Sequence, residues 1–481
     1  MRYLIGNHNV QPGITPRKWF LFTALLFGLV YALLVPPFQA PDETSHFFRA
    51  YHLSEGHLMG ITTADNRLGG YLPASLQAVY RPFAGLRYNY SARISPDSLL
   101  RAAAIPLNSG ERDFIDFANV GYYAPFPYVP YALVFTFLRP FHLAPLFLLF
   151  AGRIAGLLFW VGVVYLAIRR LPYHRWTMAF CMLLPASLFL HSSLSGDTVM
   201  NALAFYLLAR LLGLIFEERR LFSAREGIVL LVISGLITAS KVVFAPLIAL
   251  VLFMPQAKFG SGRRRRLWCC GLLLFNLIIL AAWYHYAGGK FIPYDNYNPA
   301  YRDGQQINPG VAPFEQLAFI FRHPLEYFAV LAHSFFESLP ATMAHYAGKF
   351  GWEKNYLPGP LIGMLLPALI ILGFFENRTG PVPETKHRLA FAAIAVIMSI
   401  ALATVLYLQW HAVGASRITA LQGRYFFSIL PLLWLALKQQ KWHLPQFWLQ
   451  RGAMLLSLVA LIWGCVAVAE RYYYLGIVID H

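Results

Sequence analysis

The run WFLFTALLFGLVYALLV, from Trp19 to Val35, contains no charged or amide side chain. Arg17 and Lys18 precede this run, and two prolines end it. Its length is close to the ~20 residues with which a helix crosses the hydrocarbon core of a bilayer. No small-residue site for signal cleavage follows it, so we expect it to persist as the first membrane span.

Similar apolar runs recur along all 481 residues, of which 58% are hydrophobic and only 13% are charged. Soluble domains carry about 25% charged residues, so the composition excludes a soluble enzyme, a secreted disulfide scaffold and a disordered chain. With ~20 residues per span, the sequence predicts an all-α integral membrane protein with about eleven transmembrane helices in one polytopic domain, residues 1–481. The predicted spans after the first cover 145–168, 177–194, 198–216, 227–240, 242–256, 267–286, 358–375, 389–409, 425–438 and 452–470.

The distribution of charge orients these spans. The net charge is +17, from 39 Lys and Arg against 22 Asp and Glu. When the spans alternate across the membrane, about half of the basic residues fall in short loops on one side, as the positive-inside rule requires of cytoplasmic loops. The basic balance therefore does not indicate nucleic acid. The other basic residues are candidates for contact with an anionic lipid or phosphate.

This orientation leaves two large segments on the outer face, residues 36–144 and 287–357, and no comparable segment on the cytoplasmic side. If residues 122–138 formed a full span, the basic loop at 169–175 would lie outside. We therefore predict that 122–138, with its three prolines and four tyrosines, is a helix packed at the outer interface. Functional residues are expected on the outer face.

The first outer segment opens with PPFQAPDETSHFFRA, residues 36–50, which places several ionisable side chains next to a membrane span. Asp42 and Glu43 lie at the start of a predicted helix, where the helix dipole favours carboxylates. His46 and Arg49 follow at a spacing of three residues and share one face of that helix. A solvated interfacial helix with an acidic cap would also explain the pattern. Ionisable groups at the membrane boundary are nevertheless candidates for function.

Three further charged residues lie at or near the same boundary. Asp197, in the sequence SGD between two spans, is either a helix cap or a second acidic site residue. Lys241 lies where two short spans meet, and is either a snorkelling side chain or a functional cation. Arg153 lies in the outer half of the second span, where it is either the partner of a carboxylate or a contact for phosphate.

The sequence QGRYF contains Gln422, Arg424 and Tyr425 at the outer edge of a predicted span. A guanidinium at this depth suits bidentate contact with a phosphate. The alternative is an interfacial anchor, with Tyr425 in the aromatic belt. Trp352, in the sequence FGWEK of the second outer segment, is a candidate for stacking on a sugar, although interfacial tryptophans are more common.

Three carboxylates and three cations, all expected at one depth on the outer face, make up the candidate constellation. Carboxylates act as a general base or hold a divalent cation such as Mg²⁺ or Mn²⁺, and cations stabilise a departing phosphate. The sequence contains no zinc-spaced histidine cluster, and it leaves the need for a metal open. The constellation consists of Asp42, Glu43 and Asp197 with Arg153, Lys241 and Arg424.

The motifs PxQxPDExxHFxRA (residues 37–50), SGD (195–197), FGW (350–352) and QGRYF (422–426) together resemble a bacterial multi-pass family of unknown function. That family is similar to the GT-C superfamily of integral membrane glycosyltransferases, and the resemblance covers most of the chain. It implies a GT-C-like fold whose long first periplasmic loop carries interfacial helices.

The resemblance also implies an activity on the periplasmic face of the bacterial inner membrane. A sugar would pass, with inversion, from a polyprenyl-phosphate-linked donor in the membrane lipid to a cell-envelope glycan or lipid such as lipopolysaccharide. GT-C enzymes have acidic motifs in the first outer loop and at the end of span three, which Asp42 with Glu43 and Asp197 match here. The base would be Asp42 or Glu43, and the donor phosphate would lie near Arg424 and Lys241.

Two other functions stay open on the sequence. A flippase or exporter of lipid-linked sugars predicts charged residues along a central path and inverted repeats. The charges instead gather at one boundary, and no repeat is evident, which favours the enzyme. A ligase or polymerase that moves whole glycans between lipid carriers would use a similar outer site.

Overall fold

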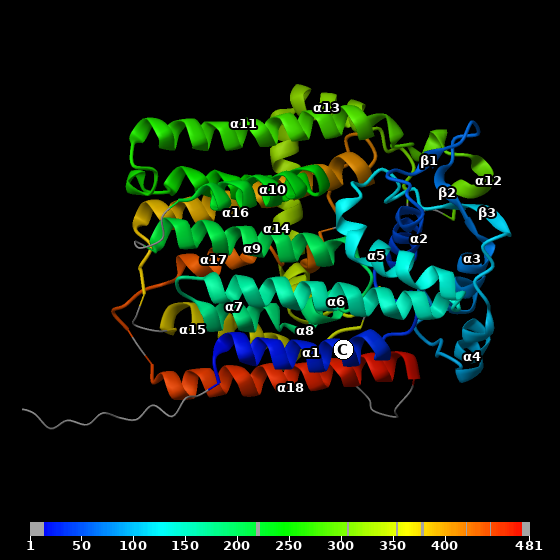
Figure 1. The fold of residues 1–481 in the computed structure, drawn as a ribbon, viewed down its shortest axis with the longest axis horizontal. Helices are drawn as coiled ribbons and strands as arrows, with labels where there is room; N and C mark the ends of the chain where they lie inside the picture. Colours follow the sequence, from blue (N-terminus) through cyan, green and yellow to red (C-terminus); the bar gives the residue numbers. More distant parts are fainter. Residues whose placement is uncertain are drawn as a thin grey trace, which may run out of the picture.

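The computed structural model describes residues 14–217, 222–304, 307–352, 355–376, 380–419, 421–442 and 444–473. Within these ranges the protein is mostly helical, and six helices are long and apolar enough to cross a membrane. Their axes run roughly parallel and form a bundle (Figure 1). These helices are α1 (Pro16–Leu34), α6 (Pro145–Arg170), α9 (Gly196–Phe216), α11 (Gly262–Ala287), α16 (Thr385–Trp410) and α18 (Gln446–Tyr473).

The sequence predicts about eleven spans, and the difference from six lies in runs that are apolar but short or broken. Proline interrupts several of these runs, because it lacks a backbone N–H and clashes with the preceding turn of a helix. Pro185 separates two short helices within 177–194, and Pro246 lies inside a 3₁₀ segment. These elements are α7 (Arg175–Met182), α8 (Pro185–His191), α10 (Ala224–Ser240), η4 (Val242–Phe253), η5 (Gln256–Phe259), α15 (Gly359–Phe375), η8 (Gly423–Phe426) and α17 (Leu430–Ala436).

Residues 36–144 cover one end of the bundle and contain a three-stranded antiparallel sheet in the order β1-β2-β3. We call this the sheet end of the molecule; it lies at the right of Figure 1. The strands are β1 (Ile61–Thr62), β2 (Leu68–Pro73) and β3 (Arg112–Asp116). The helices are α2 (Glu43–Ser54), α3 (Ala74–Tyr80), η1 (Arg81–Leu86), α4 (Pro96–Ala104), η2 (Phe126–Tyr128), α5 (Val129–Leu138) and η3 (Arg139–Phe141).

The prediction of an all-α fold is therefore wrong for this segment. Strand β2 reads LGGYLP, and its two glycines conceal it, because glycine is depleted in strands. A Cβ at Gly69 would lie 2.1 Å from the carbonyl oxygen of Ile115, and one at Gly70 would lie 2.6 Å from the ring of His52. The absence of side chains thus lets β2 approach both β3 and α2 closely.

The second large segment, residues 287–357, is largely helical. Its longest helix, α14, runs steeply across the bundle (Figure 1) and packs its last turns against α8 and η8. Because η8 contains the GRYF part of the QGRYF motif, α14 packs directly against that motif. The elements of this segment are η6 (Gly288–Lys290), η7 (Tyr294–Asn296), α12 (Pro299–Arg302), α13 (Pro313–Arg322) and α14 (Pro324–Gly348).

The other end of the bundle, which we call the basic end, carries the short Arg- and Lys-rich connections. Helix α1 begins there, and α6 ends there with Arg169 and Arg170. One continuous hydrophobic core extends from this end through the bundle into the helices of residues 36–144. The candidate site residues can therefore be held rigidly where the bundle meets the sheet end.

Candidate active site

Glu43 and Arg153 form a fully buried ion pair between the start of α2 and the middle of α6. Arg153 donates from Nε to Oε1 at 2.8 Å and from Nη2 to Oε2 at 2.6 Å, and both side chains are 0% exposed. Glu43 also accepts the backbone N–H groups of Phe38 and Leu194, each at 3.0 Å. The carboxylate therefore has four donors and faces away from solvent.

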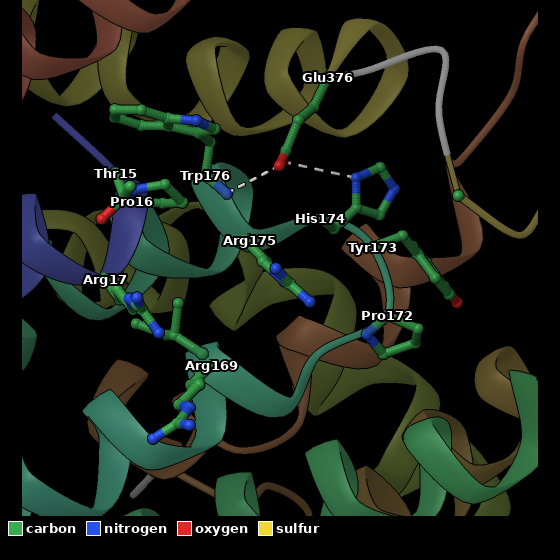
Figure 2. A pocket seen from close by; sticks show the side chains of 12 residues that line it. Thr15, Pro16, Arg17, Arg169, Pro172, Tyr173, His174, Arg175, Trp176 and Glu376 are labelled. Carbon is green, nitrogen blue, oxygen red and sulfur yellow. Dashed lines mark hydrogen bonds and ion pairs between the residues drawn. The ribbon is translucent and has the colours of Figure 1, made fainter. Parts of the chain in front are cut away.

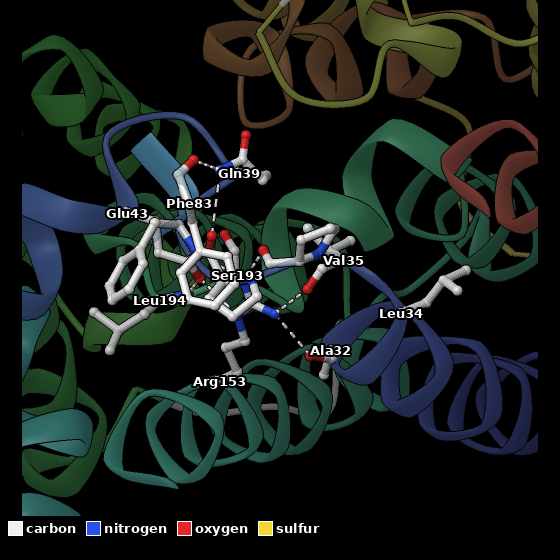
Figure 3. A network of polar contacts seen from close by, with 12 residues as sticks. Ala32, Leu34, Val35, Gln39, Glu43, Phe83, Arg153, Ser193 and Leu194 are labelled. Atoms are coloured by element: carbon white, nitrogen blue, oxygen red, sulfur yellow. Dashed lines mark hydrogen bonds and ion pairs between the residues drawn. The ribbon is translucent and has the colours of Figure 1, made fainter. Parts of the chain in front are cut away.

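Arg153 uses its remaining N–H groups on the end of α1 (Figure 3). It donates to the carbonyl oxygens of Ala32 at 2.9 Å, Val35 at 2.6 Å and Pro36 at 3.0 Å. One guanidinium thus ties α1, α6 and α2 together. These contacts favour a structural role for Glu43 and Arg153, and they give Arg153 a carboxylate partner in place of a substrate phosphate.

Asp42 lies next to Glu43 in sequence, but its side chain has a different partner. Its backbone is left-handed, with φ 62° and ψ 6°. It stands at the cap of α2 without making a side-chain capping bond, so its carboxylate is available to Arg424, whose Nη2 donates to Oδ2 at 2.8 Å. Asp42 and Arg424 are 15% and 14% exposed, in contrast to the closed pair formed by Glu43.

Asp197 and Lys241 form a second ion pair at the start of α9. Ser195 caps that helix, since its Oγ accepts the backbone N–H of Asp197 at 3.2 Å. The hydroxyl of Tyr131 donates to the carbonyl of Ser195 at 2.8 Å and holds the cap in position. Because Ser195 performs the capping, the carboxylate of Asp197 is left for Lys241, and each of these side chains is 18% exposed.

Tyr425 joins the two ion pairs. Arg424 donates from Nη2 to the Tyr425 hydroxyl at 3.2 Å, while Nζ of Lys241 lies 5.9 Å from the centroid of the Tyr425 ring. The Nε of Arg424 is buried and has no hydrogen-bond partner within the described ranges. The site thus brings two cations and two carboxylates around one phenol, and Arg424 keeps a donor for a ligand.

His46 forms another wall of this site. Its Nδ1 lies 2.8 Å from the hydroxyl of Tyr128 in η2, and Asp42, Asp197 and Arg424 are all close enough to act on its charge. Burial lowers the pKa of His46, and the nearby carboxylates do not outweigh that effect. At neutral pH His46 is therefore uncharged and acts as a neutral hydrogen-bonding group.

Among the described residues, none of the other predicted site residues forms an ion pair with Asp42, Asp197, Lys241 or Arg424. Arg49 is buried and donates to the carbonyls of His57 and Tyr123, which orders the loop after α2. The centroid of the Trp352 ring lies 3.5 Å from the guanidinium carbon of Arg87. Gln422 precedes η8, and its carbonyl accepts the N–H of Tyr425 at 3.1 Å.

Glu353 and Lys354, which follow Trp352 in the FGWEK sequence, lie outside the described residues. Within the part of the chain that the structure describes, no group of three or more His, Cys, Asp and Glu side chains is arranged to hold a metal ion. The three predicted carboxylates do not share one cation. Glu43 pairs with Arg153, Asp42 pairs with Arg424, and Asp197 pairs with Lys241.

Sequence reasoning missed Tyr128 and Tyr131 as parts of the site. Both belong to the segment rich in tyrosine and proline that was predicted only as an interfacial helix. Tyr128 contacts His46, and the guanidinium carbon of Arg49 lies 5.5 Å from its ring centroid. The spacing of His46 and Arg49 on one helix face was the available signal, since one aromatic residue can contact both.

The close packing of η8 against α14 explains why the QGR motif has a glycine at position 423. A Cβ at this position would lie 2.1 Å from the backbone nitrogen of Tyr346 in α14. We expect Gly423→Ala to push η8 off α14 and to displace the Arg424 side chain. Purified G423A should unfold at a lower temperature than the wild type, whereas G363A, on the open face of α15, should leave the unfolding temperature unchanged. Wild-type behaviour of G423A would contradict this account of the motif.

The fold and this site define a multi-pass helical membrane protein with paired charges at one end of its bundle. The profile of the family described as "Predicted membrane protein (DUF2142)" matches residues 25–433. Because this match covers most of the chain, the protein belongs to that family. The expected membership of a multi-pass membrane family is thus confirmed.

No curated protein sequence matches the chain. Among solved structures, the protein is similar to ArnT from Cupriavidus metallidurans, whose crystal structure contains undecaprenyl phosphate. The TM-score is 0.39 and the sequence identity 12%, with 93% of this chain and 75% of the ArnT chain covered.

Proposed function

We propose that this protein is a membrane glycosyltransferase that uses a polyprenyl-phosphate-linked sugar as its donor. The observation that carries the proposal is the contact between Asp42 and Arg424, a candidate base and a candidate phosphate ligand, 2.8 Å apart and partly open to solvent. The resemblance of the PDExxHF and QGRYF motifs to the GT-C superfamily supports the donor class. The acceptor would be a cell-envelope glycan or lipid.

In the proposed reaction, the donor phosphate binds to Arg424 and draws its guanidinium away from Asp42. Arginine suits this role because its planar fork matches the geometry of phosphate. Lys241, which pairs with Asp197 and lies 5.9 Å from the centroid of the Tyr425 ring, supplies a second positive charge. The arriving phosphate thus frees the carboxylate of Asp42 at the time when a base is needed.

The acceptor hydroxyl then gives its proton to Asp42 while its oxygen attacks the anomeric carbon of the sugar. The bond between that carbon and the phosphate oxygen breaks, and polyprenyl phosphate leaves with the electron pair. Attack from the side opposite the phosphate inverts the anomeric configuration. Arg424 and Lys241 stabilise the negative charge that develops on the leaving phosphate.

The proposed orientation puts the basic end in the cytoplasm and the site at the periplasmic face of the bacterial inner membrane. The short basic connections at the end opposite to residues 36–144 support it, because Lys and Arg concentrate in cytoplasmic loops. A lipid-linked donor would then lie with its tail among the helices and its sugar towards the sheet end.

Arg424→Gln should weaken use of the donor, because a neutral amide cannot replace a charge-assisted contact with phosphate. We expect KM for the donor to rise at least about tenfold, which corresponds to about 1.4 kcal/mol of lost binding. Arg424→Lys should fall between Gln and the wild type, since it keeps the charge but not the fork. The measurement is transfer by purified protein from a panel of radiolabelled polyprenyl-phosphate sugars to a cell-envelope glycolipid fraction.

Arg417→Gln is the matched control for this experiment. Arg417 is 58% exposed and pairs with Glu337 at 3.3 Å, so its loss should cost little and leave the kinetics unchanged. Movement of labelled lipid across the membrane without cleavage of the sugar–phosphate bond would indicate a flippase and overturn the proposal. Equal KM values for R424Q and the wild type would remove Arg424 from the donor site.

A further inference from the structure

A pocket of about 400 Å³ opens at the basic end of the molecule, far along the bundle from the paired-charge site. It is bordered by the start of α1, the end of α6, the start of α7 and the end of α15. The side chains around it include Thr15, Arg17, Arg169, Arg175, His174 and Glu376. The proposed glycosyl transfer uses none of these residues.

Three guanidinium groups line this pocket. Arg17 comes from α1, Arg169 from the last turn of α6 and Arg175 from the first turn of α7, and Figure 2 shows all three below Glu376 and His174. Within the described ranges no salt bridge neutralises any of them. Three guanidinium groups that line one cavity from three helices favour an anionic ligand, and guanidinium groups match phosphate best.

One carboxylate, Glu376, also lines the pocket, and it leaves the three arginines in excess. It is 2% exposed and accepts hydrogen bonds from the backbone of Trp176 at 2.8 Å and from the backbone and hydroxyl of Thr177 at 2.7 and 2.6 Å. These three neutral donors from the first turn of α7 stabilise the carboxylate where it stands. The carboxylate fixes the start of α7 and holds Arg175 at the pocket.

His174 is a second observation that points to a ligand. It is 2% exposed, and neither of its ring nitrogens makes a hydrogen bond within the described part of the chain, although Nδ1 lies 3.6 Å from Oε2 of Glu376. Its backbone is left-handed, with φ 56°, which is uncommon outside glycine. Buried polar groups normally have hydrogen-bond partners. The Nε2 of His174, which has none within the described residues, is therefore suited to contact a bound group.

We propose that this pocket binds a phosphate group, carried by an anionic phospholipid of the adjacent leaflet. Its volume lies within the range of small-ligand sites, about 300–1,000 Å³. Arg17 and Arg169 lie at the ends of the membrane-crossing helices α1 and α6, where lipid headgroups are found, and Arg175 lines the same pocket from the start of α7. An anionic leaflet attracts basic side chains at this depth. The bound phosphate would bridge α1, α6 and α7 at the basic end.

The test compares thermal unfolding of the purified full chain in detergent with phosphatidylglycerol, with phosphatidylcholine and with inorganic phosphate. Phosphatidylglycerol should raise the unfolding temperature of the wild type, and phosphatidylcholine should not. The variant R17Q/R169Q/R175Q should lower the affinity for phosphatidylglycerol at least about tenfold. R17Q/R169Q, which leaves the Arg175 bond to the Leu171 carbonyl in place, serves if the triple variant fails to fold.

The matched control is R263Q/R264Q/R266Q, which removes the same charge from exposed positions at the same end of the molecule. It should bind phosphatidylglycerol as the wild type does. Stabilisation by inorganic phosphate alone, lost in the pocket variants, would support the phosphate site and identify a soluble ligand in place of a lipid. Equal binding by the pocket and control variants, or no stabilisation by either anion, would overturn the proposal.

Discussion

Asp42→Asn is expected to abolish glycosyl transfer and to leave the protein folded. The side chain keeps its size and can still accept a hydrogen bond from Arg424, but it can no longer take a proton from the acceptor. Positioned general bases contribute about 10²–10⁴ in rate, so kcat should fall by about that factor. Asp42 and Arg424 are 15% and 14% exposed, and the asparagine would still offer Arg424 an oxygen acceptor, so the unfolding temperature should fall less than when the fully buried Glu43–Arg153 pair is broken. Transfer by D42N and wild type is compared with both donor and acceptor at saturating concentration.

Asp113→Asn is the matched control, because Asp113 is an exposed carboxylate on β3 at the same end of the molecule. It should transfer at the wild-type rate. Asp197→Asn should have a smaller effect on kcat than D42N, since Asp197 positions Lys241 and does not itself take the proton in the proposed reaction. Wild-type kcat in D42N would remove Asp42 from the role of base. A greater loss in D197N would transfer that role to Asp197.

The clustering of four candidate residues could be predicted from the sequence, because the positive-inside rule assigns each loop to one of two sides of the membrane. That rule brought Asp42, Asp197, Lys241 and Arg424 to one predicted depth, and the structure brings these four together around Tyr425. The cation with which each carboxylate pairs could not be predicted from the sequence. These partners lie more than 40 residues apart in the chain, and the packing of the helices brings them together. The QGR motif lies hundreds of residues after the PDE motif, and only their contact joins them.

Asp42 and Glu43 are neighbours in the sequence but have different ion-pair partners, which the local sequence pattern does not predict. Both are carboxylates at the start of the same helix, and no property of the sequence ranks one above the other. The left-handed backbone at Asp42 directs that side chain towards Arg424, while Glu43 enters the first turn of α2 and reaches Arg153. A single change of backbone conformation thus separates the proposed base from a residue that only holds the helices.

The sequence predicts too many spanning helices because hydropathy measures how apolar a run is and does not show whether the run forms one continuous helix. The runs around Pro185 and Pro246 are as apolar as those of full spans, but proline prevents one continuous helix. The sequence does not predict the sheet, because strand β2 contains Gly69 and Gly70, and glycine is uncommon in strands. The apolar composition therefore predicts the membrane class well and the individual elements less well.

The closed pair of Glu43 and Arg153 explains how the site can be both polar and rigid. It ties the chain from Val35 to Glu43 to α6, immediately before and beside Asp42. Asp42 therefore has a fixed backbone even though its side chain exchanges partners in the proposed reaction. Catalytic geometry generally depends on such supporting contacts. Loss of the pair should consequently damage the fold first and activity only as a result.

Arg153→Met and Glu43→Gln should each destabilise the protein strongly, because each leaves the other member of a fully buried pair without its charged partner. Breaking a buried ion pair in this way costs about 3–5 kcal/mol. We expect a large fall in the unfolding temperature of the purified protein, measured by intrinsic fluorescence in detergent. The fraction that remains folded should transfer sugar at close to the wild-type rate.

The double variant E43L/R153M separates a structural pair from a catalytic one. Replacing both charges by apolar side chains of similar size removes the unpaired charge, so stability should recover part of the loss seen in the single variants. Recovery should be incomplete, since the carbonyls of Ala32, Val35 and Pro36 also lose their donor. A double variant that folds and transfers sugar would rule out Glu43 as the base. If instead E43Q unfolds at the wild-type temperature but is inactive, Glu43 performs the chemistry, and Asp42 serves to hold Arg424.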